Sequence, residues 1–253
     1  MVQRGLSWLE FFQPRWRPRV RLLCFPYAGG SAAAYRDWQK ALPDTIEVWP
    51  IQLPGRGKRL SEDPYTQIAH LIDKLGEDIL SNMDGPFAIF GYSMGALIGF
   101  ELARRAQRKG ASGPIHLFAA ARRAPHLPPN HRLTYGLPDI ELIAELRDMQ
   151  GTPPQLLENQ EAMRLFLPAI RADFELVQTY CFTAGPALRC PLTAMGGLRD
   201  RSVDYEQVEP WKAHTLARFA VRMFPGDHFF INQCERDLLA VVAQELNQQV
   251  GTA

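Results

Sequence analysis

The chain has 253 residues, which is enough for one large domain or two small ones with a substantial apolar core. Hydrophobic residues make up 46% and charged residues 22%, so neither a disordered nor a fibrous protein is expected. The formal net charge of +1 argues against a chain built mainly to bind nucleic acid.

The sequence shows no sign of a membrane anchor or an export signal. No run approaches the roughly 18 apolar residues of a transmembrane helix. The N-terminal 20 residues interrupt their short apolar patch with Glu10, Pro14 and several arginines, unlike a signal peptide. The four cysteines are scattered and form no CxxC pair, which predicts neither a disulfide framework nor a metal site. We therefore predict a cytoplasmic protein that binds no metal, nucleic acid or membrane.

The first half of the chain alternates short apolar runs with amphipathic segments. Strands are predicted at 21–25, 46–51, 87–90 and 115–120, and helices at 31–42, 68–79 and 96–107. Strands that alternate with helices in this way form a mostly parallel sheet with helices on both faces. The fold class is therefore α/β.

This alternation stops at about residue 122. The segment from about 123 to 186 is rich in proline and contains two amphipathic helices, 140–149 and 163–182. It is too long for a simple connection, so it is predicted to be a helical lid inserted into a single domain, 1–253, above the carboxyl edge of the sheet. Strands return at 191–195 and 219–224, and a helix at 231–248 closes the chain.

Residues 91–95 read GYSMG and lie between a predicted strand and a predicted helix. A serine nucleophile needs such a tight strand-to-helix turn, with small residues two positions away on each side so that the helix packs closely. Ser93 is therefore the predicted nucleophile. The start of the helix offers unpaired N–H groups, including that of Met94, to a developing oxyanion.

A serine hydroxyl needs a base, and in this architecture the acid and then the histidine follow the serine along the chain. His228 follows the strand at 219–224 and a turn, and is the predicted general base. Asp200, in the loop after the strand at 191–195, is predicted to orient it, with Asp204 as the alternative. Asp227, adjacent to the base, is expected to be a turn residue.

The remaining histidines are weaker candidates. His214 lies in a helical stretch beside Trp211 and is expected to be structural. His126 and His131 belong to the proline-rich start of the lid, where a contact with substrate stays open.

The loop after the first strand is expected to supply a second oxyanion donor. Residues 26–30 read PYAGG, and small residues let the backbone approach a bound acyl carbonyl. The N–H of Ala28 is favoured, with that of Tyr27 as the alternative.

Together these segments resemble the type II thioesterases, the stand-alone editing enzymes of polyketide and nonribosomal peptide assembly lines. The blocks that carry the resemblance are FPYAGGS (25–31), QLPGRG (52–57), GYSMG (91–95), ARRAPH (121–126), GGLRD (196–200), Trp211 with Thr215, and FPGDHFF (224–230). The resemblance spans about residues 16 to 248 and is far more specific than the serine motif alone. Two departures are Tyr92, where many relatives have histidine, and Arg201, where proline is frequent.

The resemblance implies an α/β-hydrolase fold and a Ser-His-Asp acyl-enzyme mechanism that removes aberrant or stalled acyl groups from carrier proteins. Ser93 would attack the thioester, His228 would take its proton, and Asp200 would hold the imidazolium. The implied partners are acyl or peptidyl carrier proteins, and the implied state is a monomer. No cofactor is expected, because the substrate itself carries the phosphopantetheine arm.

Arginines are candidates for docking an acidic carrier protein. Arg122 and Arg123 lie at the base of the lid, and Arg56 and Arg59 follow the second strand. Arg56 is equally compatible with a structural turn in which it is paired internally.

Other readings stay open at this point. A general carboxylesterase would share the triad without the other blocks, and a non-catalytic carrier-binding module would keep only the fold. A terminal, cyclising thioesterase domain is a close relative. Because Met1 lies close before the first expected strand, a free-standing chain is the simpler expectation.

Overall fold

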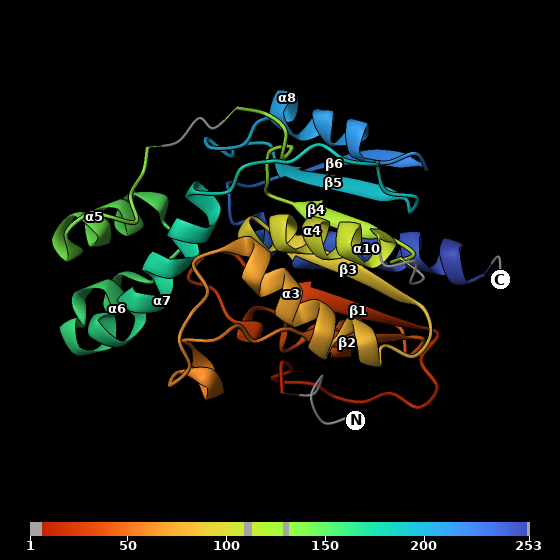
Figure 1. Ribbon diagram of the computed structural model, residues 1–253, viewed down its shortest axis with the longest axis horizontal. Coiled ribbons are helices and arrows are strands. Elements are labelled where there is room, and N and C mark those ends of the chain that lie inside the picture. Colours follow the sequence, from red (N-terminus) through yellow and green to blue (C-terminus); the bar gives the residue numbers. More distant parts are fainter. Residues whose placement is uncertain (1–6, 109–112, 129–131, 252–253) are drawn as a thin grey trace.

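A parallel sheet of six strands forms the centre of the protein (Figure 1). The computed structural model describes residues 7–108, 113–128 and 132–251. The strands are β1 (Val20–Phe25), β2 (Ile46–Pro50), β3 (Phe87–Tyr92), β4 (Leu117–Ala120), β5 (Leu192–Gly197) and β6 (Phe219–Phe224). They lie in the order β2-β1-β3-β4-β5-β6, and every neighbouring pair is parallel. The predicted α/β class with a mostly parallel sheet is confirmed.

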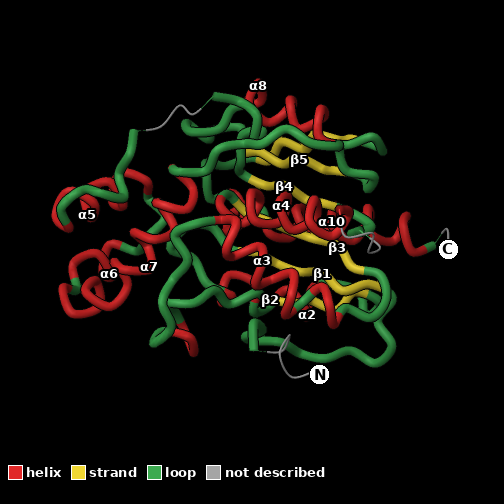
Figure 2. The backbone as a smooth tube through the Cα atoms, viewed as in Figure 1, coloured by secondary structure: helices red, strands yellow, loops and turns green. Residues whose placement is uncertain are grey.

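Helices cover both faces of this sheet, as Figure 2 shows with strands in yellow and helices in red. The α-helices are α2 (Trp38–Ala41), α3 (Ile68–Asp78), α4 (Met94–Arg108), α5 (Asp139–Met149), α6 (Pro154–Glu158), α7 (Gln160–Gln178), α8 (Tyr205–Val208), α9 (Phe230–Gln233) and α10 (Glu235–Val250). Short 3₁₀ segments are η1 (Ala32–Tyr35), η2 (Gly57–Arg59), η3 (Leu80–Asn82) and η4 (Glu209–His214). Apolar side chains of α3 and α4 pack on one face, and those of α2, α9 and α10 pack on the other.

The inner strands read as continuous apolar runs because both of their faces are covered. All six residues of β3 are buried, whereas β6, at the edge of the sheet, is mostly half-buried. Parallel strands place their carboxyl ends at one edge of the sheet, so the loops after β1, β3, β5 and β6 meet there.

Two helices predicted as continuous are broken. The segment expected as one helix from 31 to 42 forms η1 and α2 instead, with Tyr35 and Trp38 both buried against Phe90. The closing helix is interrupted at Cys234, which has φ −125° and ψ 28° and donates its thiol to Pro225 O at 2.7 Å. In both places tertiary packing overrides the helical apolar pattern.

The segment predicted as a lid, 123–186, contains α5, α6 and α7, of which the short α6 was not expected. These helices lie beyond the carboxyl edge of the sheet, at the left in Figure 1. They share an apolar cluster of their own that includes Leu142, Leu157 and Leu167. The helix α7 begins three residues before the predicted start because the Asn159 side chain caps it, accepting a hydrogen bond from Ala162 N at 3.0 Å.

Candidate active site

Ser93 lies on the sharp turn between β3 and α4. Its backbone φ is +52°, in the left-handed region that a non-glycine residue rarely adopts. The turn is held by hydrogen bonds from Ser93 N to Ala120 O at 2.8 Å and from Ala96 N to Ser93 O at 3.1 Å. Strain of this kind persists where the surrounding structure fixes it, and here it presents the hydroxyl at the edge of the sheet.

The two glycines that flank Ser93 allow this turn to form. A Cβ atom at Gly91 would overlap the carbonyl oxygen of Gly95, and a Cβ atom at Gly95 would overlap the carbonyl oxygen of Phe25 in β1. The clash in both cases is with backbone, which cannot move aside as a side chain can. The GxSxG spacing is therefore a packing requirement of α4 against β1 and β3.

The structure brings Ser93, His228 and Asp200 together in one line of hydrogen bonds. His228 Nε2 lies 3.3 Å from Ser93 Oγ, and His228 Nδ1 lies 2.7 Å from Asp200 Oδ2. The Asp200 side chain is fully buried, while the His228 side chain is 25% exposed. An imidazole that contacts a hydroxyl on one nitrogen and a carboxylate on the other can take up a proton from that hydroxyl.

The Asp200 carboxylate is held in its ionised form. Burial acts to raise its pKa, but the hydrogen bond and charge of His228, together with hydrogen bonds from Ser202, outweigh burial and lower the pKa. The second oxygen, Oδ1, accepts from Ser202 N at 2.8 Å, Ser202 Oγ at 2.7 Å and Val203 N at 3.1 Å. These three donors fix the carboxylate and leave Oδ2 for His228.

The Tyr92 side chain anchors the backbone that carries His228. Its hydroxyl donates to His228 O at 2.6 Å and accepts from Ile231 N at 3.3 Å. Tyr92 was noted in the sequence only as a departure from the resembling family. Its side chain is fully buried, so this hydroxyl ties the residue before Ser93 to the loop after β6.

The predicted oxyanion donors lie at the start of α4 and in the turn after β1, the strand that pairs with β3. Met94 is the first residue of the helix α4, whose N-terminal end carries partial positive charge. The turn after β1 is closed by a hydrogen bond from Gly30 N to Tyr27 O at 2.9 Å. Within the described chain, neither Tyr27 N nor Ala28 N donates to another protein group. Both predicted amides of this loop are therefore available to a ligand.

Other predicted residues have structural partners. Asp204 caps α8, accepting from Gln207 N at 2.9 Å, and it is Asp200 rather than Asp204 that contacts His228. Asp227 accepts from Phe229 N at 2.7 Å, as a turn residue does.

Two of the other histidines also have a structural partner. His126 Nδ1 lies 2.7 Å from His214 Nε2, so these two residues pair with each other. His131 lies outside the described residues.

The structure also separates the arginines considered for docking. Arg56 is 5% exposed and pairs internally with Asp173. Arg59 pairs with Glu62 and lies over the Trp8 ring. Arg56 is therefore corrected from a docking candidate to an internal ion pair, which was the alternative interpretation.

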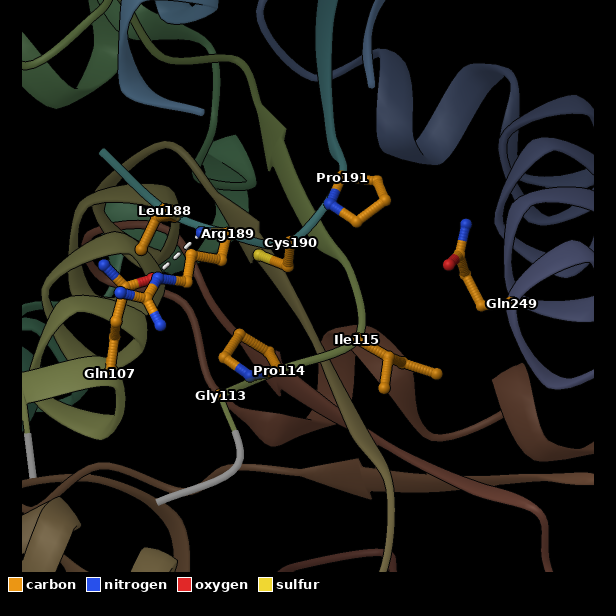
Figure 3. Close-up of a pocket in the computed structure, with 9 residues that line it drawn as sticks. All are labelled: Gln107, Gly113, Pro114, Ile115, Leu188, Arg189, Cys190, Pro191 and Gln249. Atoms are coloured by element: carbon orange, nitrogen blue, oxygen red, sulfur yellow. Dashed lines mark hydrogen bonds between the residues drawn. The ribbon is translucent and has the colours of Figure 1, made fainter. Parts of the chain in front are cut away.

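A cavity of about 410 Å³ lies at the opposite end of the sheet (Figure 3). Residues 113–115 and 188–191, together with Gln107 and Gln249, line it at the amino ends of β4 and β5. The hydrogen bond drawn there joins Arg189 N to Gln107 Oε1 at 2.9 Å. It contains none of the predicted site residues, so it is separate from Ser93.

Two features of the described residues bear on other kinds of site. No described helix combines the length and apolar character needed to cross a lipid bilayer. Among the same residues, no three His, Cys, Asp or Glu side chains form a group that could hold a metal ion.

Comparison with known proteins agrees with the geometry. The model of the thioesterase domain family matches residues 20–249. Linear gramicidin dehydrogenase LgrE of Brevibacillus parabrevis is 44% identical, covering 90% of this chain and 88% of its own. Gramicidin S biosynthesis protein GrsT of Aneurinibacillus migulanus is 41% identical, covering 90% and 89%. The solved type II thioesterase BorB, from the borrelidin biosynthetic cluster, is 36% identical with a TM-score of 0.86, over 94% of this chain and 98% of that one.

Proposed function

The chain belongs to the thioesterase domain family, and we propose that it hydrolyses acyl groups from the phosphopantetheine thiol of acyl or peptidyl carrier proteins. In this role it removes aberrant or stalled chains from polyketide or nonribosomal peptide assembly lines. GrsT is named for gramicidin S biosynthesis, and BorB is a type II thioesterase from the borrelidin biosynthetic cluster. The observation that carries the proposal is the hydrogen-bonded line from Ser93 through His228 to Asp200.

The first half of the reaction acylates the enzyme. His228 Nε2 takes the Ser93 hydroxyl proton as Oγ attacks the thioester carbonyl carbon. The tetrahedral intermediate collapses by breaking the carbon–sulfur bond, and the imidazolium gives its proton to the departing pantetheine sulfur. Asp200 stays ionised throughout and stabilises the imidazolium, which agrees with its lowered pKa.

The second half releases the product. Water replaces the thiol, His228 takes one of its protons, and the hydroxide attacks the Ser93 ester carbonyl. Collapse of the second intermediate returns the proton to Ser93 Oγ and frees a carboxylic acid. In both halves the N–H groups of Met94 and Ala28, with Tyr27 as the alternative to Ala28, donate to the oxyanion. The cycle calls for no cofactor of the enzyme's own.

One relative is named a dehydrogenase, which is a different class of reaction. A dinucleotide would need the glycine turn after the first strand to accept its pyrophosphate. Here Gly29 N already donates to the buried Asp173 carboxylate at 2.7 Å. A negative charge in that place opposes pyrophosphate, so the geometry favours the hydrolase.

The test is mass spectrometry of acyl-carrier proteins incubated with the enzyme and with Ser93→Ala. We expect free holo-carrier with the wild type and a loss of about 10⁴-fold or more in rate with the variant. A strong preference for p-nitrophenyl esters with no carrier turnover would favour a carboxylesterase. Carrier binding without hydrolysis by the wild type would favour a non-catalytic module.

A further inference from the structure

A buried ion pair joins the lid helix α7 to the two loops beneath it. Asp173, on α7, is 2% exposed, and Arg56, in the loop after β2, is 5% exposed. Arg56 Nη1 donates to Asp173 Oδ2 at 2.6 Å, and Nη2 donates to Oδ1 at 2.7 Å. This bidentate arrangement fixes the relative orientation of the guanidinium and the carboxylate.

Both partners also contact the backbone of the loop that carries Ala28. Asp173 Oδ2 accepts from Gly29 N at 2.7 Å, and Arg56 Nη1 donates to Gly30 O at 2.9 Å. Gly29 has φ +74°, the left-handed value that the third residue of a type II turn requires. The ion pair is therefore hydrogen-bonded to the turn that carries the predicted oxyanion donor Ala28 N and its alternative, Tyr27 N.

Side-chain packing holds the same loop against α7. A Cβ atom on Gly29 would lie 3.3 Å from Ile170 Cγ1, one turn before Asp173 on the helix. Ala28 packs against the apolar cluster that includes Ile170, so the loop contacts α7 through apolar side chains as well as through the hydrogen bond to Asp173.

An ion pair at this depth is a poor device for stability alone, because removing two charges from water offsets most of their attraction. It is well suited to fixing geometry, since an oxyanion donor must be held within a fraction of an ångström of the position that the charge occupies. In the described chain no hydrogen bond or ion pair joins Asp173 to Ser93, His228 or Asp200. Asp173 therefore has no direct polar contact with these three residues, and its hydrogen bond to Gly29 N links it to the loop that carries Ala28.

We propose that Asp173, held by Arg56, is a positioning residue that aims the Ala28 N–H at the oxyanion. This inference rests on the proposed function of Ser93 and the oxyanion donors. It assigns a lid residue to the stabilisation of the tetrahedral intermediate, in addition to any role of the lid in covering the substrate.

The test is Asp173→Asn, assayed with a p-nitrophenyl ester and with a trifluoromethyl ketone. The ketone adds to Ser93 Oγ and forms an oxyanion, so its inhibition constant reports the donors directly. We expect kcat to fall about 10- to 100-fold with KM within about twofold, and ketone affinity to fall by a similar factor. Arg56→Lys, which keeps the Asp173 charge and the Gly29 hydrogen bond, should lose about 3- to 10-fold.

The matched control is Asp139→Asn. It removes the 2.7 Å ion pair between Asp139, on α5, and Arg171, which lies on α7 as Asp173 does. We expect its kcat and ketone affinity to stay within about twofold of wild type. A folded Asp173→Asn enzyme with unchanged kcat, or with a loss confined to KM, would overturn the proposal. If that variant does not fold, Arg56→Lys decides by the same criteria, and failure of both to fold would show a structural role only.

The two probes need Ser93 but no carrier protein. A wild-type enzyme that hydrolyses the ester and ignores acyl-carrier thioesters would therefore contradict the proposed function while leaving the positioning test readable. A wild-type enzyme that the trifluoromethyl ketone does not inhibit would instead contradict the assignment of the oxyanion donors.

Discussion

Replacing Tyr92 with phenylalanine tests whether the loop after β6 needs a side-chain anchor. The substitution removes one oxygen and leaves the ring in its buried place against Phe230. Burial raises the pKa of Tyr92 far above its ordinary value, so the group is a neutral hydroxyl at every pH used for assay. Its loss therefore removes one donated and one accepted hydrogen bond without changing any charge.

The magnitude follows from what is left without a partner. Ile231 N, on a residue that is 2% exposed, loses its acceptor, and His228 O loses a donor at 2.6 Å. An unsatisfied buried N–H costs about 1–3 kcal/mol and a lost hydrogen bond about 1 kcal/mol, so we expect the free energy of unfolding to fall by about 2–4 kcal/mol. Because His228 Nε2 is already 3.3 Å from Ser93 Oγ, loosening its backbone should also lower kcat by about tenfold.

Urea unfolding and steady-state kinetics measure the two effects, and Tyr205→Phe serves as the control. Tyr205 is 50% exposed, so its change in unfolding free energy should stay within about 0.5 kcal/mol. A Tyr92→Phe protein as stable as the control, with wild-type kcat, would refute the anchoring role of the hydroxyl.

Two further predictions concern packing and pH. Gly95→Ala places a Cβ atom on the backbone carbonyl of Phe25 in β1, so we expect little folded protein on size exclusion and little esterase activity. Gly136→Ala is the control, because a Cβ atom there would have no other atom within 4 Å, and it should behave as wild type. Burial, followed by the charges of His126 and Arg104, lowers the pKa of His214 from 6.5 to about 4. Between pH 6.5 and about 4, His214 is therefore protonated in the unfolded chain but not in the folded one, so the free energy of unfolding should fall as the pH drops through this range. The variant His214→Asn should show a smaller fall, measured by urea unfolding at several pH values. The same pH dependence in the variant and the wild type would contradict the lowered pKa of His214.

Much of the fold follows from apolar periodicity, and the meeting of the site residues follows from the fold. Each strand predicted from a short apolar run is present within a few residues of its expected ends. Ser93, Asp200 and His228 were each placed after a strand, and the carboxyl ends of parallel strands share one edge. The proximity of these three residues could therefore be predicted from the sequence, while their catalytic roles stay predictions.

The supporting contacts were not predictable in the same way. Arg56 and Asp173 are 117 positions apart, and only the packing of α7 over the loop after β2 makes them neighbours. The sequence offered two partial signals. Arg56 was compatible with an internal pair, and an aspartate among the apolar residues of α7, beside Ile170 and Phe174, indicates a buried partner without naming it. The anchoring role of the Tyr92 hydroxyl was not predicted. Tyr92 was expected in the turn after the strand at 87–90, where it was noted only as a departure from the resembling family, whereas it is the last residue of β3.

Asp200 and His228 are also held together by backbone hydrogen bonds between the loops that carry them. Leu198 N donates to Phe224 O at 2.8 Å, and Arg199 N donates to Gly226 O at 2.8 Å, which joins the loop after β5 to the loop after β6. The sheet register continues into these loops, so Asp200 and His228 stay adjacent even if one side chain is changed. Substitutions at Asp200 should therefore alter proton transfer far more than loop geometry. Because backbone pairing of β5 with β6 sets where the two loops lie, the positions of the strands and of the residues just after them were sufficient to predict that Asp200 and His228 are neighbours.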